Sequence, residues 1–310
     1  MWIKLLLALG LILAASPVQA EPKLLTWHDV LAFPHGEAAR RVAYGPDPLQ
    51  VAELWRAAGA GPHPVLVMIH GGCWRADLPD LDLQRPLSEA LAGQGWAVWN
   101  IEYRRIGHEG GTYPGTFTDV ARSIDALRGV AVEEHLDLSR VVFMGHSAGG
   151  HLAVWAAARP RLPKSSPLWT ADPLVPRGVI SLAGIDDLEA YHATGPDACG
   201  GPGVVESLVD LKGRGASAWA DTSPLRLLPI HVRQLVVSGA HDPIVPPRFG
   251  EAYVAAARQA GDPVEEIVFP DAGHFELIDP GSTAWGKLYP MLDALAPLPP
   301  KTMPHPKTRP

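Results

Sequence analysis

The segment 141–155, VVFMGHSAGGHLAVW, constrains the fold more than any other part of the sequence. An apolar run typical of a buried strand ends at Gly145, Ser147 follows two residues later, and a pattern of helical spacing begins at once. So tight a turn from strand to helix requires that Gly145 and Gly149 carry no side chain, because the two elements touch there. The G-x-S-x-G spacing in this context predicts that Ser147 stands clear at the carboxyl end of a sheet as a nucleophile.

Short apolar runs alternate with helical patterns along most of the chain. Strands are predicted at 64–70, 96–104, 140–145, 177–184, 233–240 and 264–270, and helices at 83–95, 117–135, 149–159, 249–261 and 284–295. Apolar strands that alternate with helices form a mostly parallel central sheet flanked by helices, so we predict an α/β fold. The segment at about 185–225 breaks this rhythm and is rich in Gly, Asp and Ala, which indicates a small cap-like insertion.

A serine hydroxyl needs a general base, and 13 histidines are candidates. We predict His274, in FPDAGHFELID, because its loop follows the last predicted strand and therefore lies at the same sheet edge as the serine. Asp242, in SGAHDPIVPP, follows the preceding strand and is predicted to orient the imidazole. Asp271, in the same loop as the histidine, and the pair Asp186 and Asp187 after an earlier strand are the alternatives to Asp242.

The predicted strand at 64–70 ends in HGGCW, a motif that suits the stabilisation of a negative oxygen. Gly71 and Gly72 allow a close approach of the backbone to a substrate, so an N–H from Gly72 or Cys73 can join the N–H of Ala148 in an oxyanion hole. His70 and Cys73 together suggest a metal pair, but no further ligand follows at a suitable spacing. We therefore expect neither a metal nor a cofactor.

Candidate pocket residues lie beside these motifs. Trp74 directly follows Gly71, Gly72 and Cys73, which we call the oxyanion loop. Trp219 lies in the insertion and His146 flanks the serine, so Trp74, Trp219 and His146 are the predicted residues of the substrate pocket. The tryptophans on predicted strands and helices are expected in the core, where large aromatic side chains usually pack.

The motifs HGGCW, GHSAGGHLA, HDPIVP and DAGHFELID resemble the α/β-hydrolase superfamily, in particular its kynurenine formamidase and bacterial carboxylesterase branch. The resemblance extends from about residue 40 to about residue 295. It implies an α/β-hydrolase fold with Ser147 as nucleophile, His274 as base and Asp242 as acid. The expected function is a serine hydrolase that cleaves small-molecule carboxylic esters through an acyl-enzyme. An arylformamidase-type amide hydrolase is the alternative, and a non-catalytic binding protein on the same scaffold is a remote one.

The first twenty residues are typical of a secretory signal peptide. One lysine precedes a short apolar run, and Val18-Gln19-Ala20 forms a small-x-small cleavage pattern. The run is too short to span a bilayer, so we expect no stable membrane insertion after cleavage and an exported protein, periplasmic or secreted. The hydrolase domain is then expected at 21–296, followed by a disordered tail at 297–310. The net charge of −7 argues against a nucleic acid partner.

The sequence contains two cysteines, Cys73 and Cys199. Export makes a disulfide between them feasible, and pairing would tie the insertion to the oxyanion loop. Two separate buried thiols are the alternative, because sequence does not supply the distance that a bridge requires.

Overall fold

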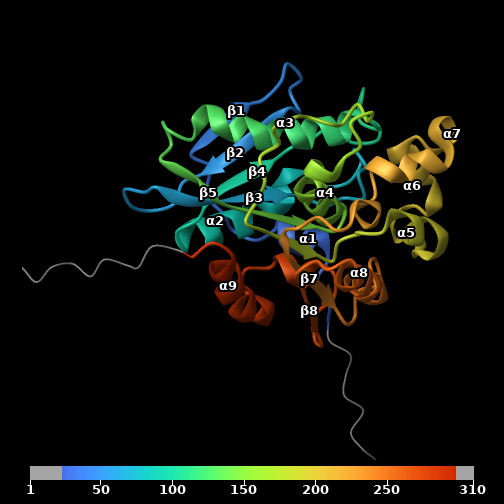
Figure 1. Cartoon of the computed structure of the whole chain (residues 1–310). Coiled ribbons are helices and arrows are strands. Elements are labelled where there is room, and N and C mark those ends of the chain that lie inside the picture. Colours follow the sequence, from blue (N-terminus) through green and yellow to red (C-terminus); the bar gives the residue numbers. More distant parts are fainter. Residues whose placement is uncertain (1–22, 298–310) are drawn as a thin grey trace, which may run out of the picture.

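The computed structural model describes residues 23–297, and over this range eight strands form one sheet (Figure 1). The strands are β1 (Arg40–Ala43), β2 (Val51–Trp55), β3 (His63–Ile69), β4 (Ala97–Ile101), β5 (Leu136–His146), β6 (Gly178–Leu182), β7 (Arg233–Gly239) and β8 (Val264–Phe269). Their order across the sheet is β1-β2-β4-β3-β5-β6-β7-β8. The pairs β1–β2 and β2–β4 are antiparallel and every other pair is parallel, which confirms the predicted sheet and adds two strands that were not predicted.

Helices cover both faces of the sheet. The five predicted helices are α2 (Arg85–Gly93), α3 (Gly115–Val130), α4 (Ala148–Ala157), α8 (Arg248–Gln259) and α9 (Thr283–Leu295), and a short α1 (Trp27–Leu31) precedes β1. Figure 1 shows α3 above the sheet and α2 and α9 below it. Every residue of α4 is buried, because this helix packs against β3, β5 and β6 at the centre of the fold.

The register of the parallel strands brings their carboxyl ends to one edge. Ile69 of β3 lies opposite Gly145 of β5, and Gly239 of β7 lies opposite Phe269 of β8. The loops that follow these four strands therefore meet above the same edge. They carry all the residues that the sequence assigns to nucleophile, acid, base and oxyanion hole.

The segment expected as an insertion consists of short helices. These are α5 (Leu188–Thr194), η3 (Asp197–Cys199), α6 (Pro202–Val209), α7 (Leu211–Arg214), η4 (Gly215–Asp221) and η5 (Pro224–Leu227), and Figure 1 shows α5, α6 and α7 at one end of the sheet. The buried Asp221 joins this segment to the body, since it accepts hydrogen bonds from Tyr113 at 3.0 Å and Ser166 at 2.6 Å. Arg214 donates to its other oxygen at 2.6 Å.

Two expectations concern the ends of the chain. The signal peptide predicted at 1–20 and all but the first residue of the tail predicted at 297–310 lie outside the described residues. Within 23–297, no helix is both long and apolar enough to cross a membrane.

Candidate active site

The turn between β5 and α4 holds Ser147 in a backbone conformation with φ 56° and ψ −122°. A Cβ on Gly145 would lie 2.0 Å from the carbonyl oxygen of Gly149, and a Cβ on Gly149 would lie 2.0 Å from that of Ile69. Both glycines are therefore required by contact between backbones, as the sequence predicts. The positive φ of a serine is a local strain of the kind found at functional sites, and the turn aims its hydroxyl above the sheet edge.

His274 and Asp242 lie together although 32 residues separate them. The Nδ1–H of His274 donates to Oδ2 of Asp242 at 2.6 Å. The Oδ1 of the same carboxylate accepts from the backbone N–H groups of Ile244 at 2.7 Å and Val245 at 2.9 Å. Both carboxylate oxygens are thus occupied, which fixes the tautomer of His274 and leaves its Nε2 as a proton acceptor.

Ser147 and His274 line one cavity of about 170 Å³. They are 2% and 4% exposed, so a reaction between them would take place largely out of water. The rival acids lie elsewhere: Asp186 is buried and accepts from the hydroxyl of Ser181 at 2.8 Å, and Asp271 is exposed on the surface.

The HGGCW loop approaches the serine turn closely. A Cβ on Gly71 would lie 3.0 Å from the carbonyl oxygen of His146 and 3.2 Å from Cβ of Ser147. Gly72 and Cys73 follow with φ of 99° and 49°, a tight left-handed turn that lines the cavity. The loop thus lies against the serine turn from which α4 begins, where the helix dipole adds positive potential.

A buried carboxylate supports this loop from behind. Glu102 accepts hydrogen bonds from Nε2 of His70 at 3.2 Å, and from the backbone N–H groups of Tyr103 at 2.8 Å and Leu81 at 3.3 Å. The hydroxyl of Tyr103 in turn donates to the carbonyl oxygen of His70 at 2.8 Å. Burial alone would raise the pKa of Glu102, but the nearby His70 and Arg105 outweigh it, so the pKa is lowered and the group stays ionised.

The two cysteines form a disulfide, Cys73–Cys199, with their Cα atoms 5.4 Å apart. This confirms the pairing hypothesis and joins the oxyanion loop to η3 of the cap. Ala198, the neighbour of Cys199, lines the cavity beside the serine. The disulfide therefore fixes one wall of the cavity to the loop that carries the candidate oxyanion donors.

His146 lines the same cavity and contacts both the backbone and the ring of His274. Its Nε2–H donates to the carbonyl oxygen of His274 at 3.0 Å, and the two rings lie 4.4 Å apart. Burial, together with the neighbouring His274, holds the pKa of His146 well below its usual range, so this ring is neutral. It positions the segment of His274 without competing for the proton of Ser147.

The tryptophans predicted for the pocket lie elsewhere, which corrects that expectation. Trp74 has φ 55°, and this turn directs its side chain into the core, where its Nε1–H donates to Nδ1 of His151 at 3.2 Å. Trp219 lines a separate open hollow on the cap, between α5 and η4.

The walls of the cavity come instead from apolar residues that sequence reasoning did not select. They are Trp27, Leu78, Pro79, Leu83, Ile244 and Phe275. One local signal was available for the first of these, since TWHD is a capping box that starts a helix at Trp27.

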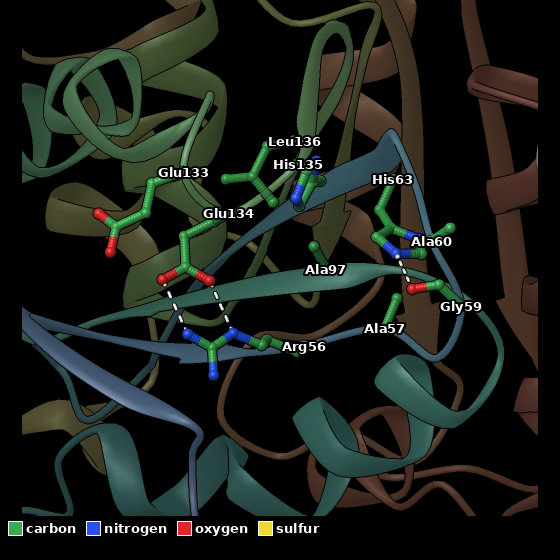
Figure 2. Close-up of a pocket in the computed structure, with 10 residues that line it drawn as sticks. All are labelled: Arg56, Ala57, Gly59, Ala60, His63, Ala97, Glu133, Glu134, His135 and Leu136. Carbon is green, nitrogen blue, oxygen red and sulfur yellow. Dashed lines mark hydrogen bonds and ion pairs between the residues drawn. The ribbon is translucent and has the colours of Figure 1, made fainter.

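A second hollow of about 260 Å³ lies at the opposite end of the sheet (Figure 2). His63 at the start of β3 and Leu136 at the start of β5 line it, and Arg56 pairs there with Glu134 at 2.6 Å. The residues that line it include no serine, threonine or cysteine, so it offers no hydroxyl or thiol nucleophile. Within the described part of the chain, no group of three or more His, Cys, Asp and Glu residues could hold a metal ion.

Known proteins resemble this chain in both sequence and structure. Esterase LipC of Mycobacterium tuberculosis is 29% identical over 79% of this chain and 61% of its own, and the probable carboxylic ester hydrolase LipM of the same organism is 28% identical over 73% and 53%. The chain thus spans little more than half the length of these curated relatives. Esterase B from Lactobacillus rhamnosis superposes with a TM-score of 0.70 at 18% identity, over 87% of this chain and 90% of that one. The signature of the BD-FAE family matches residues 55–255, and the chain therefore belongs to this family of α/β-hydrolase esterases.

Proposed function

We propose that this protein is a serine hydrolase that cleaves small-molecule carboxylic esters through an acyl-enzyme. One observation carries the proposal: His274, held by Asp242 at 2.6 Å, lines the same buried cavity as the strained Ser147. A nucleophile, a base and a group that orients the base are the minimum that this chemistry requires. The relatives LipC and LipM are named as an esterase and a probable carboxylic ester hydrolase, which supports the proposal.

In the first step, Oγ of Ser147 attacks the ester carbonyl carbon while Nε2 of His274 accepts the hydroxyl proton. Asp242 stabilises the imidazolium that forms. The carbonyl oxygen becomes an oxyanion, and the proposed donors to it are the N–H groups of Gly72 or Cys73 and of Ala148. When the tetrahedral intermediate collapses, the bond to the alcohol oxygen breaks and His274 returns its proton to that oxygen.

In the second step, water attacks the acyl group on the serine and His274 again accepts the proton. Collapse of the second intermediate releases the carboxylic acid and restores the hydroxyl of Ser147. His274 carries both protons: the one that Ser147 loses leaves with the alcohol, and the one that restores its hydroxyl comes from the attacking water.

Labelling with a fluorophosphonate probe tests the nucleophile. The wild-type protein is expected to bind the probe covalently, and Ser147→Ala is expected to lose labelling and turnover while it remains folded. A folded wild type that neither labels nor hydrolyses esters would instead favour a binding protein on this scaffold. Faster turnover of N-formylkynurenine than of p-nitrophenyl acetate, by orders of magnitude, would favour a formamidase.

We also propose that the protein is exported. The Cys73–Cys199 disulfide supports this, because structural disulfides persist mainly in oxidising compartments. Fractionation of cells that produce the full chain, with mass spectrometry of its amino terminus, tests the proposal. We expect a periplasmic or secreted protein that begins at residue 21, and a full-length protein in the cytoplasm would refute it.

A further inference from the structure

The amino-terminal segment 24–31 contributes a wall to the candidate active site. Trp27, the first residue of α1, is partly buried and lines the cavity of Ser147 and His274, although it lies 120 positions before the serine. Figure 1 shows α1 near the centre of the fold, and α1 packs against η1 (Leu81–Gln84) and η6 (Phe275–Ile278), which also border the cavity.

The position of this segment is fixed by hydrogen bonds to the loop that carries the base. The carboxylate of Glu276 accepts from the backbone N–H of Leu25 at 2.5 Å and from that of Gly273 at 2.8 Å. Gly273 directly precedes His274, and a Cβ there would lie 3.1 Å from the side chain of Leu24. One acidic side chain thus ties the amino-terminal segment to the catalytic loop.

Two further features hold α1 in place. Thr26 and Asp29 cap its start reciprocally, with the hydroxyl of Thr26 donating to the carboxylate at 2.7 Å. Val30, on the inner side of the helix, is completely buried and anchors it to the core. The exposed ring of His28 stacks on the indole of Trp27 with centroids 3.3 Å apart, so the indole is supported on its outer side.

The cavity that the indole helps to enclose is small and largely apolar. Its volume of about 170 Å³ is well below the range of about 300–1,000 Å³ that is usual for ligand pockets. Apart from the reacting groups, the oxyanion loop and His146, its walls are Trp27, Leu78, Pro79, Leu83, Ile244, Phe275 and Ala198. A short apolar chain fits such a space, and the length that fits depends on how far each wall extends.

We propose that Trp27 is a specificity-determining residue that limits the length of the apolar chain beside the scissile ester. The proposal rests on the ester-hydrolase function proposed above and names its substrate class as short-chain esters. Removal of the indole opens the cavity on the side of α1. Chains with several more methylenes then enter, while the geometry of Ser147, His274 and Asp242 stays unchanged.

The test compares kcat/KM across two series, p-nitrophenyl esters from acetate to octanoate and alkyl acetates from methyl to octyl, for wild type and Trp27→Ala. Wild type is expected to prefer the shortest members. For each series we compare kcat/KM for the longest ester with kcat/KM for the shortest. In Trp27→Ala this ratio is expected to rise by about 10-fold or more in one series, because a single methylene in a hydrophobic pocket is worth about 10- to 200-fold. The variant should still be labelled covalently by the fluorophosphonate probe, which shows that Ser147 remains reactive, and loss of labelling in a folded Trp27→Ala would contradict an unchanged geometry of the reacting groups.

Trp169→Ala is the matched control, because Trp169 is 37% exposed and does not line the cavity. Its chain-length profiles should match those of wild type. Trp27→Leu keeps an apolar side chain on α1 and provides a second variant if alanine lowers the thermal stability. Equal profiles for wild type and both Trp27 variants would overturn this proposal alone. A folded wild type without turnover or labelling would overturn the ester-hydrolase proposal, and this one with it.

Discussion

The exchange Asp242→Asn tests the proposed triad of Ser147, His274 and Asp242 more directly than loss of the serine does, because the structure determines the orientation of the new amide. Oδ1 of Asp242 accepts from the backbone N–H groups of Ile244 and Val245. These two donors, of which that of Val245 is buried, still need an acceptor in the variant, so the amide oxygen takes the place of Oδ1. The amide NH₂ is then turned toward Nδ1 of His274, where Oδ2 accepted at 2.6 Å.

An NH₂ group donates, so His274 must present a bare Nδ1 to it and carry its proton on Nε2. In that tautomer, Nε2 has no lone pair for the proton of Ser147. We therefore expect kcat to fall by about 10⁴-fold. This corresponds to about 5 kcal/mol of transition-state stabilisation at 1.36 kcal/mol per factor of ten.

The assay measures kcat and KM for p-nitrophenyl acetate at pH 7, together with the rate of fluorophosphonate labelling. KM should change little, since Asp242 does not line the cavity. Labelling should slow in parallel with kcat. Asp271→Asn is the control, because Asp271 lies on the surface of the loop that carries His274, and its activity should stay within a few-fold of wild type. An Asp242→Asn enzyme within tenfold of wild type, or an equal loss in Asp271→Asn, would refute the reasoning.

Three further predictions concern stability. Cys199→Ser removes a disulfide that spans 126 positions, so the free energy of unfolding measured in urea should fall by about 2–5 kcal/mol. A reductant should lower the free energy of unfolding of wild type but not of the variant. Burial raises the pKa of Asp186 from its usual value of 3.8 to about 7, so the stability that the neutral carboxyl contributes should be complete below pH 4 and lost as the pH rises toward 7. Urea unfolding at pH 5 and 8 should show about 3 kcal/mol of this loss in wild type and none of it in Asp186→Asn. Gly149→Ala puts a Cβ 2.0 Å from a carbonyl oxygen of β3 and should lower the melting temperature strongly or prevent folding. Gly129→Ala, at an open helical site in α3, should raise stability by about 0.5–1 kcal/mol, and equal effects of the two exchanges would contradict the packing argument.

The central strands and the serine turn were predictable because their determinants are local. Apolar runs mark the strands from β3 to β8. The serine turn is marked by glycines at which the backbones of two elements must touch. Of the two strands that were not predicted, β2 was missed for a physical reason. β2 contains Glu53, which reads as a surface residue but is 2% exposed, and Arg85 from α2 neutralises it at 2.6 Å. The sequence of the strand does not show that a residue of another element neutralises this charge, so its pattern of apolar residues does not indicate a buried strand.

The chemistry of the site followed from sequence order and local spacing, since the loops after parallel strands must meet at one sheet edge. The walls of the cavity did not. Trp74 adjoins the oxyanion loop in the chain, yet a positive φ turns its indole into the core. Trp27 is far from Ser147 in the sequence, yet hydrogen bonds to Glu276 hold its segment against the loop of His274. Reacting groups are selected by residue type and place along a strand, whereas pocket shape depends on which distant surfaces pack together, and only folding of the whole chain decides that.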